Sequence, residues 1–260
     1  MPNLKDVLAG FQGEGATQCV EAPDNWKQGR TLYGGMTAAL CWHAATRAVP
    51  DLPPLRAVQV AFVGPAQGML DFRVELIRRG RNSAVLEVVC DGEAGPAARV
   101  LFTCANPRES SVSHDLTPMP DAGQPEGIED FHRNPMPELA FPSNFDIRLV
   151  SGGRPLSGGS PDLLVWTRIK DDAGVDPVTA LLALADVLPP GAMAEMTQRG
   201  PVSTMTWGVD FNQPVTSRGW HLLRTNSEQA ADGYSLQASQ MWDEQGRRVL
   251  VARQVVAIFG

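Results

Sequence analysis

The chain contains an internal repeat, and this repeat limits the folds open to it more than any other feature. The Phe-x-x-Pro pattern of residues 62–65 recurs at 211–214, and the Arg-Val-Leu of residues 99–101 recurs at 248–250, both with an offset of 149. The order of expected elements repeats as well: a strand, a buried helix and four further strands. Such self-similarity predicts a protein built from two similar units. The helices do not keep the offset, which implies an insertion or deletion between helix and strands.

Each repeat contains one run of helical length that is apolar nearly all round. In the first repeat, residues 36–49 follow the glycine pair Gly34 and Gly35. In the second, Asp176–Leu188 reads DPVTALLALADVL. A helix without a polar face is normally buried inside the protein. We therefore expect one central helix in each repeat.

Runs of strand length follow each helix, with β-branched residues or alternating apolar and polar residues. In the first repeat these runs are 55–63, 70–79, 83–90 and 99–105. In the second repeat they are 203–211, 220–227, 234–243 and 248–258. Earlier strands are expected near 16–22, 144–150 and 162–170. The pattern indicates a central helix followed by an antiparallel meander of four strands, twice.

Residues 107–141 have the composition of a linker. They contain six prolines, many serines and acidic residues, and little periodicity, which is typical of a segment without a packed core. The sequence therefore predicts an N-terminal repeat at 1–106, a Pro-rich linker at 107–141 and a C-terminal repeat at 142–260.

Composition excludes several classes of function. The net charge is -7 and the pI about 5.1, which argues against nucleic-acid or anionic-membrane partners, since both need a basic face. No run of 18 uninterrupted apolar residues occurs, and the N-terminus has no signal-peptide pattern. The four cysteines form no CxxC pair and are expected to be reduced thiols of a cytoplasmic protein. The four histidines show no metal-ligand spacing, so no metal is expected.

Asp186 is an unusual residue for its place in the second apolar helix. It shares a helix face with Leu182 and Ala183, which precede it by four and three residues. An ionised side chain on an apolar face is costly unless it is paired, so Asp186 is a candidate for a functional site. The alternative is that Asp186 lies in the frayed last turn before Pro189 and points to water.

The first repeat lacks counterparts of Asp186 and of two other polar residues. Gln254 lies on an otherwise apolar face of the last strand, and 149 residues earlier the chain has Ala105. Thr204 lies on the first strand after the second helix, and its counterpart is Leu55. The first helix has no carboxylate. An acid, a hydroxyl and an amide that occur together in one repeat only favour a functional site there.

Two alternatives remain open at this point. Strict alternation along residues 203–211 places Thr204 and Thr206 on the face opposite Met205 and Trp207, which would also fit an ordinary solvated face. Gln254 would serve equally as a structural bridge to a backbone carbonyl, because a buried amide must find partners.

Several segments together carry a family resemblance. They are LYGGMTAALCWHAA, AFVGPA, SNFDIRLVSGG, LALADVLPP, VDFNQPV and VARQVVAIF, in that order across most of residues 30–258. On these segments the sequence resembles the acyl-CoA thioesterase II family of double-hotdog proteins. The resemblance implies an α+β fold of two tandem copies, each a central helix wrapped by an antiparallel sheet, with the two sheets continuous.

The resemblance also implies an activity and its residues. Members hydrolyse an acyl-CoA thioester to the free acid and coenzyme A (CoA), with no metal or resident cofactor. An Asp on the second central helix, a Thr or Ser on the next strand and a Gln on the last strand bind the attacking water. By local context these are Asp186, Thr204 and Gln254, with Ser203 and Thr206 as alternatives to Thr204.

Two further groups of residues are candidates for substrate contacts. Backbone N–H groups at the start of the first helix would form an oxyanion hole, at Gly34, Gly35 and Met36. The alternative for the glycines is close packing. A second group would bind the CoA phosphates, although a charged hairpin tip is the favoured alternative for it: Arg78, Arg79 and Arg81. Some relatives carry a His where this chain has Gln59, which argues against a mechanism that needs that His.

Three other functions compete with thioester hydrolysis. A non-catalytic acyl-CoA or acyl-ligand binder would use the same polar residues for packing alone. Hotdog hydratases and dehydratases usually work with an Asp–His pair on a loop entering the helix, and no His of this chain occupies such a place. A serine hydrolase is disfavoured because no G-x-S-x-G elbow occurs. The acyl chain and further self-association into a homo-oligomer are left open.

Overall fold

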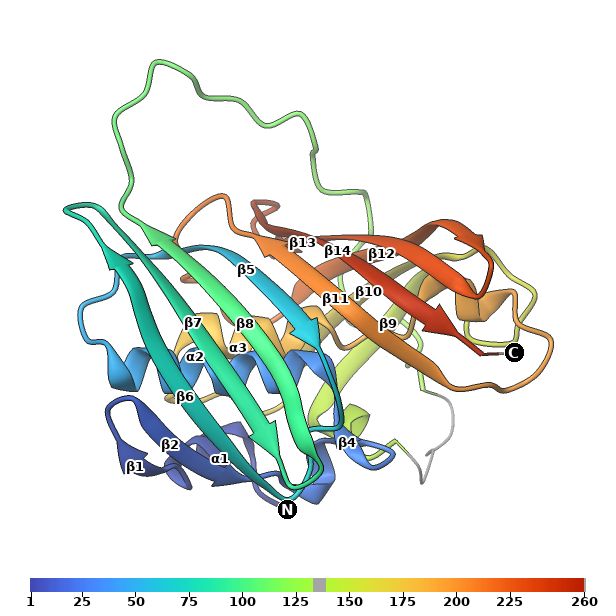
Figure 1. Ribbon diagram of the computed structural model, residues 1–260. Coiled ribbons are helices and arrows are strands. Elements are labelled where there is room, and N and C mark those ends of the chain that lie inside the picture. Colours follow the sequence, from blue (N-terminus) through green and yellow to red (C-terminus); the bar gives the residue numbers. More distant parts are fainter. Residues whose placement is uncertain (133–138, 260) are drawn as a thin grey trace.

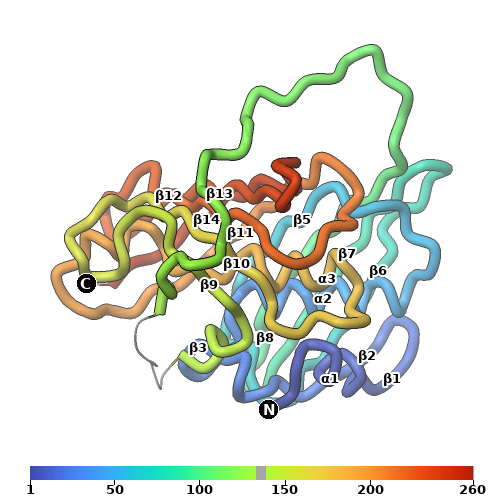
Figure 2. The backbone as a smooth tube through the Cα atoms, turned by 180° about the vertical axis from the view of Figure 1, so that it is seen from behind, coloured from blue at the N-terminus to red at the C-terminus, as the bar shows by residue number. Residues whose placement is uncertain are grey.

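The computed structural model describes residues 1–132 and 139–259, so Pro135 and Pro137 of the predicted linker and Gly260 lie outside the described residues. Two central helices, α2 (Gly34–Ala48) and α3 (Pro177–Ala185), pack against one another behind a large curved sheet (Figures 1 and 2). Within the described residues this sheet has twelve strands, in the order β1-β2-β6-β7-β8-β5-β11-β14-β13-β12-β10-β9.

The strands divide into two equivalent sets of six. The first set is β1 (Gln12–Glu14), β2 (Thr17–Glu21), β5 (Leu55–Phe62), β6 (Met69–Arg79), β7 (Ser83–Gly92) and β8 (Gly95–Ala105). The second set is β9 (Phe145–Gly152), β10 (Asp162–Ile169), β11 (Val202–Asp210), β12 (His221–Ala231), β13 (Tyr234–Asp243) and β14 (Arg248–Ile258). The remaining elements are α1 (Leu4–Ala9), β3 (Lys27–Gln28), β4 (Thr31–Leu32) and three short 3₁₀ segments, η1 (Asp24–Trp26), η2 (Phe141–Asn144) and η3 (Gly191–Ala194). The predicted double hotdog is thereby confirmed.

The seam between the two sets is the antiparallel pair β5 and β11. Residues 57–61 of β5 pair with residues 206–210 of β11, so the two sheets are continuous, as predicted. Each set occupies one half of the sheet in Figure 1, blue to green for the first and yellow to red for the second.

The predicted order of the meander is wrong in one respect. β5 pairs with β8 and not with the next strand β6, and β11 likewise pairs with β14 and not with β12. The connection after β5, residues 63–68, contains Gly64 and Pro65 and is longer than the two-residue turns that join neighbouring strands most tightly. This crossing brings β5 and β11 to the middle of the sheet, where each has a free edge for the other.

The second central helix is shorter than predicted and ends before Asp186. Asp176 is the N-cap, and its side chain accepts a hydrogen bond from the Thr179 N–H, while Pro177 occupies the first helical position, where a missing N–H costs nothing. Asp186 is the C-cap residue, with φ -114° and ψ 25°. The chain leaves the helix here because Pro189 cannot donate a helical hydrogen bond and restricts Leu188 before it.

The repeat is not in a single register across the sheet. Trp207 of β11 pairs with Gln254 of β14, and Val58 of β5 pairs with Phe102 of β8. Trp207 follows Val58 by 149 residues, whereas Gln254 follows Phe102 by 152. The structural counterpart of Gln254 is therefore the buried Phe102, and the predicted counterpart, Ala105, is wrong because the second copy has three more residues between these strands.

Part of the segment between the two repeats covers the outer face of the second half. Trp166 Nε1–H donates to the Gly123 carbonyl at 3.2 Å, and Trp242 Nε1–H donates to the Thr117 carbonyl at 3.3 Å. A small apolar cluster forms underneath, and it includes Trp220. The division at 1–106, 107–141 and 142–260 stays a prediction. Among the described residues, no helix is both long and apolar enough to cross a membrane.

Candidate active site

A cavity of about 860 Å³ opens between the two halves, where α2 begins and α3 ends. Residues of both halves line it, because the Gly34 end of α2 lies against the Asp186 end of α3. Much of its wall is apolar, formed by side chains that include Leu32, Phe62, Phe131, Leu156, Val187 and Met193. Asp186, Thr204 and Gln254 are its polar members from the predicted site.

The Asp186 carboxylate turns inward and is held at both oxygens. Gln254 Nε2–H donates to Oδ1 at 2.5 Å, and the Gly35 backbone N–H donates to Oδ2 at 2.9 Å. Because α2 begins at Gly34, the Gly35 N–H is one of the donors that a helix leaves unpaired at its positive end. The alternative that Asp186 points to bulk water is therefore wrong.

The glycine pair is required by this close approach of backbone and carboxylate. A Cβ added at Gly34 would lie 2.7 Å from Asp186 Oδ2 and 2.7 Å from the Phe62 ring. A Cβ added at Gly35 would lie 2.8 Å from the Tyr33 ring and 2.9 Å from the Ala183 carbonyl. All four distances are shorter than a Cβ tolerates, so glycine is needed at both positions for space.

The environment of Asp186 shifts its pKa towards neutral pH. Burial raises the pKa of Asp186 to about 7, against the hydrogen bonds from Gln254 and Gly35, which lower it. Asp186 is half-buried and lines the cavity. The pKa of the neighbouring Tyr33 is raised, first by burial and then by the charge of Asp186, so its hydroxyl stays protonated and donates to the Ala183 carbonyl at 2.8 Å.

Gln254 is itself held by a second glutamine that the sequence did not indicate. Gln237 Nε2–H donates to Gln254 Oε1 at 3.2 Å, and the Gly191 N–H donates to Gln237 Oε1 at 2.6 Å. On β13 the polar residues Ser235, Gln237 and Ser239 alternate with Leu236 and Ala238. Alternation alone assigns such polar residues to the solvent face, yet all three are buried, so no sequence pattern pointed to Gln237.

Thr204 reaches the cavity through an irregularity in β11. The pairing with β14 shifts between Thr204 and Thr206, which leaves Met205 as a β-bulge, and Met205 is 45% exposed. A bulge reverses the alternation of side chains beyond it. Thr204 therefore faces inward with Trp207 and Gln254, and the predicted placement of Thr204 on the opposite face is wrong. The pairing of β5 with β8 shifts in the equivalent place, between Leu55 and Ala57.

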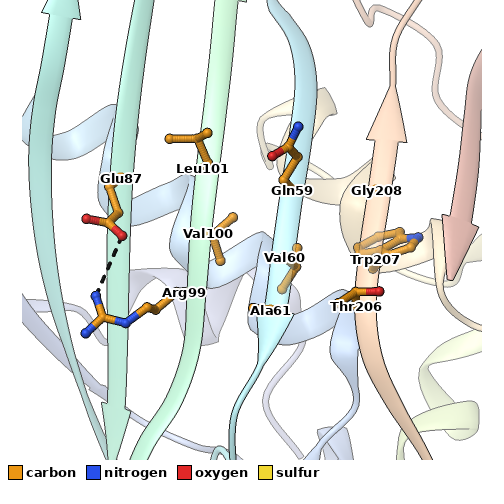
Figure 3. Close-up of a pocket in the computed structure, with 10 residues that line it drawn as sticks. All are labelled: Gln59, Val60, Ala61, Glu87, Arg99, Val100, Leu101, Thr206, Trp207 and Gly208. Carbon is orange, nitrogen blue, oxygen red and sulfur yellow. Dashed lines mark ion pairs between the residues drawn. The ribbon is translucent and has the colours of Figure 1, made fainter. Parts of the chain in front are cut away.

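The alternatives to Thr204 are separated by the same bulge. Ser203 also lines the cavity. Thr206 instead lines a shallow depression of about 420 Å³ on the outer face of the sheet, together with Gln59 and Gly208 (Figure 3). An ion pair of 3.6 Å between Arg99 and Glu87 borders this depression. Position 59 thus faces away from Asp186, and a His there would not reach the carboxylate.

The structure does not bring every predicted substrate-binding residue to the cavity. Met36 is 0% exposed within the core, and the Gly35 N–H is occupied by Asp186, whereas Gly34 lines the cavity. The predicted phosphate-binding group lies at the β6–β7 tip, and the Phe62 end of β5 that lines the cavity is at the opposite end of these strands. This group is Arg78, Arg79 and Arg81.

Two cations that the sequence did not single out line the cavity: Arg154 and Arg199. Arg154 lies in the Gly/Ser-rich loop after β9, and its guanidinium donates to the carbonyls of Phe131 at 3.0 Å and Asp130 at 2.9 Å. A cation within a glycine-rich loop was the available signal, since such loops often approach ligands.

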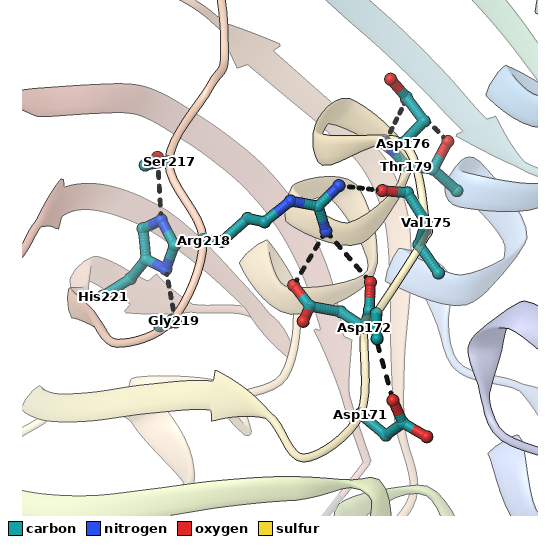
Figure 4. Close-up of polar contacts among 10 residues, drawn as sticks. Asp171, Asp172, Val175, Asp176, Thr179, Ser217, Arg218, Gly219 and His221 are labelled. Carbon is teal, nitrogen blue, oxygen red and sulfur yellow. Dashed lines mark hydrogen bonds and ion pairs between the residues drawn. The ribbon is translucent and has the colours of Figure 1, made fainter.

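The other end of the helix pair has a different arrangement (Figure 4). Asp176 accepts hydrogen bonds from the Thr179 N–H at 2.9 Å and from Trp42 Nε1–H at 3.2 Å. Arg218, from the loop after β11, donates to the Asp172 carbonyl at 3.0 Å and to the Val175 carbonyl. Here the polar groups tie the start of α3 to its neighbours.

His221 belongs to the same structural cluster. Its Nδ1–H donates to the Gly219 carbonyl at 3.1 Å, and the Ser217 hydroxyl lies 3.1 Å from its Nε2 (Figure 4). Burial lowers the pKa of His221, so the ring is neutral at pH 7. Its contacts hold the loop that carries Arg218.

Comparison with known proteins agrees with this architecture. A family model described as the acyl-CoA thioesterase N-terminal domain matches residues 22–105, and one described as the acyl-CoA thioesterase C-terminal domain matches residues 114–258. The acyl-CoA thioesterase 2 of Haemophilus influenzae is 23% identical over 249 residues, covering 86% of this chain and 86% of that protein.

Solved structures of low sequence identity share the fold. A conserved protein of unknown function with a hot dog fold from Alicyclobacillus acidocaldarius has a TM-score of 0.87 at 20% identity, over 100% of this chain and 99% of that chain. The acyl-CoA thioesterase II TesB2 of Mycobacterium marinum has a TM-score of 0.75 at 19% identity, over 96% of each chain.

Proposed function

The chain belongs to the acyl-CoA thioesterase II family and is a thioester hydrolase, and we propose that Asp186 is the general base that activates the attacking water. The observation that carries this proposal is a carboxylate with a pKa of about 7, held by Gln254 and Gly35 and facing the cavity. A base with a pKa near the working pH is ionised often enough to act and still takes up a proton readily.

The reaction then follows from these groups. Water attacks the thioester carbonyl carbon while Asp186 takes its proton, which forms a tetrahedral oxyanion. The oxyanion collapses, the C–S bond breaks, and the thiolate of CoA receives the proton from Asp186. The products are the free acid and CoA, and Asp186 returns to its ionised form.

The remaining predicted residues have positioning and electrostatic roles in this proposal. Gln254 fixes the carboxylate, and the Thr204 hydroxyl holds the water in line with the carbonyl carbon, so that the reacting atoms meet in a productive geometry. Gly34 is the predicted oxyanion-hole residue that lines the cavity. Its N–H lies at the positive end of α2, where a developing negative charge is stabilised.

The cavity wall supports a proposal for how the substrate lies. Its apolar side chains, among them Phe62, Leu156 and Met193, would surround the acyl group. Among the residues that the structure describes, Arg154 and Arg199 are cations of the cavity wall, and we assign the CoA phosphates to their neighbourhood in place of the β6–β7 tip. A cytoplasmic location and chemistry without a metal or resident cofactor stay predictions.

Release of free thiol from a panel of acyl-CoAs tests the function directly. We expect hydrolysis by the wild-type protein and a loss on the order of 10²–10⁴ in kcat for Asp186→Asn, the range typical of a general base. Equal rates for the two proteins would sink the mechanism. Saturable binding of acyl-CoAs without thiol release would identify a ligand-binding protein, and hydration of an enoyl-CoA would identify a lyase.

A further inference from the structure

We propose that Gln237 is a positioning residue that sets the orientation of the Gln254 amide toward the catalytic carboxylate. The inference rests on the proposed function of Asp186. Gln237 lies on β13, is 3% exposed and is not part of the cavity wall. An effect on the reaction must therefore pass through a residue that Gln237 contacts, and Gln254 is the contact that reaches Asp186.

The argument begins with the direction of the hydrogen bonds. A glutamine side chain has one end that accepts and one end that donates. The Gly191 N–H can only donate, so it must meet Gln237 Oε1, and the contact is 2.6 Å. This leaves Gln237 Nε2–H to donate to Gln254 Oε1 at 3.2 Å, and Gln254 Nε2–H to donate to Asp186 Oδ1 at 2.5 Å.

If the two amide groups were turned over, the hydrogen bonds to Gly191 and to Asp186 would both be lost. If Gln237 were turned over, its NH₂ group would face the Gly191 N–H, and its oxygen would face the oxygen of Gln254. If Gln254 turned with it, its oxygen would face the ionised Asp186, which has no proton to donate. A single backbone N–H therefore determines which end of Gln254 the carboxylate meets.

The Gly191 N–H is a fixed reference because its backbone packs closely against Pro161 and Ser227. A Cβ at Gly191 would lie 2.3 Å from the Pro161 carbonyl oxygen and 3.0 Å from the Ser227 N. The Ser227 N–H donates to the Pro161 carbonyl at 2.9 Å, so both neighbours are themselves held. Gly191 also directly follows Pro190 and opens η3, which restricts the chain further.

The consequence for the reaction is a change in proton affinity and in geometry. The hydrogen bond from Gln254 lowers the pKa of Asp186 against the larger effect of burial. Without Gln237, Gln254 is free to present its oxygen to the carboxylate part of the time. The ionised form of Asp186 would then be less favoured, and the bound water would be held less well.

Two substitutions and one control test the inference by a graded response. Gln237→Met removes both hydrogen bonds at nearly constant shape. Gln237→Glu places an acceptor where Gln254 needs a donor, so Gln254 turns its NH₂ group away from Asp186. Ser239→Ala is the matched control, because it breaks a buried side-chain hydrogen bond on the same strand, that of Thr225 and Ser239 at 2.8 Å, without touching Gln254.

The first readout is the pH profile of kcat/KM, with kcat and KM measured separately. We expect the acidic limb to move to higher pH for Gln237→Met and further for Gln237→Glu, with kcat at pH 7 lower by roughly tenfold and KM nearly unchanged. Ser239→Ala keeps the wild-type limb and kcat. An unchanged limb in folded Gln237→Met, or an equal loss in Ser239→Ala, would overturn the inference.

A second readout does not depend on turnover. Titration of the ¹³C-labelled Asp186 carboxyl group by NMR, with circular dichroism as the check on folding, should give the same order of variants. If the carboxyl titrates in that order but Asp186→Asn hydrolyses acyl-CoA like the wild type, the proposed general base is wrong and the role of Gln237 toward Asp186 survives. If Asp186→Asn is inactive and the order is absent, the inference alone fails.

Discussion

The two ends of the helix pair each carry an aspartate beside a helix terminus, and only one of them is suited to catalysis. Asp176 is exposed and caps its own helix, with hydrogen bonds from Thr179 and Trp42. Asp186 lies in the cavity wall and accepts from the start of the other central helix and from Gln254. The residue type is the same. The two aspartates differ in their burial and in the elements that supply their hydrogen-bond donors.

This difference separates a structural carboxylate from a reactive one in physical terms. At Asp176 solvent and local donors stabilise the charge, and the energy is used to start α3. At Asp186 burial opposes the charge more strongly than the two donors favour it, so the pKa is raised to about 7. A group poised between its two protonation states is suited to carry a proton during a reaction.

Substituting each aspartate in turn is the strongest test of whether Asp186 is catalytic and Asp176 structural. We expect Asp186→Asn to lower kcat on the order of 10²–10⁴. We expect Asp176→Ala to lower the free energy of unfolding by about 1 kcal/mol, as loss of an N-cap does, with kcat nearly unchanged. Steady-state kinetics and chemical denaturation measure the two effects, and a kinetic loss in Asp176→Ala as large as in Asp186→Asn would refute the distinction.

The next largest effect is expected from crowding the start of α2. Gly34→Ala places a methyl group 2.7 Å from Asp186 Oδ2 and from Phe62, which must displace the carboxylate. A loss in kcat on the order of 10²-fold is expected from a displacement near 1 Å. Gly208→Ala is the control, since a Cβ there meets nothing within 4 Å, and wild-type kinetics in both variants would show that the glycine pair has no part in the site.

A third prediction concerns pH. Ionised Asp186 is the active form, and its pKa of about 7 means that protonation removes it as the pH falls below that value. We expect kcat/KM to drop about tenfold for each pH unit below 7 and to level off above it. A kcat/KM profile that is flat between pH 5 and 7 would show that the essential base is another residue. The control is Asp186→Asn, whose residual kcat/KM should not show this fall below pH 7.

The smallest expected effect distinguishes the two threonines on either side of the bulge. Thr204→Val removes a hydroxyl from the cavity wall and should lower kcat by about tenfold or less, the value of one hydrogen bond. Thr206→Val alters the outer face and should leave kcat unchanged. A larger loss in Thr206→Val would show that the bulge does not orient the strand as described.

Much of the fold could be predicted because it depends on local patterns that the second copy repeats. Apolar runs of helical length gave α2 and α3, and alternation gave β6, β7 and β13. The pairing of β5 with β8 could not be read in this way, because alternation describes one strand and carries no information about its neighbour. The strand register of the second repeat could not be predicted either. Two short matches at an offset of 149 do not reveal that this repeat has three more residues before Gln254.

The candidate site shows the same limit more sharply. Asp186 and Gln254 stand out as polar residues in apolar runs, and the structure places them in direct contact. Thr204 was assigned to the wrong face because a bulge has no signature in the alternation. Gln237 gave no signal because its neighbours on the buried face, Ser235 and Ser239, are polar as well, so a sequence pattern cannot distinguish this part of the strand from a solvated one.

The seam between β5 and β11 also affects how the two halves can diverge. Two identical chains joined along such a seam would associate in a bimolecular step, and each substitution would appear at both ends of the helix pair. Here one chain supplies both strands, so pairing is intramolecular and does not depend on the protein concentration. The two halves can therefore change independently. One half keeps Leu55 and Phe102 for packing, while the other carries Thr204 and Gln254.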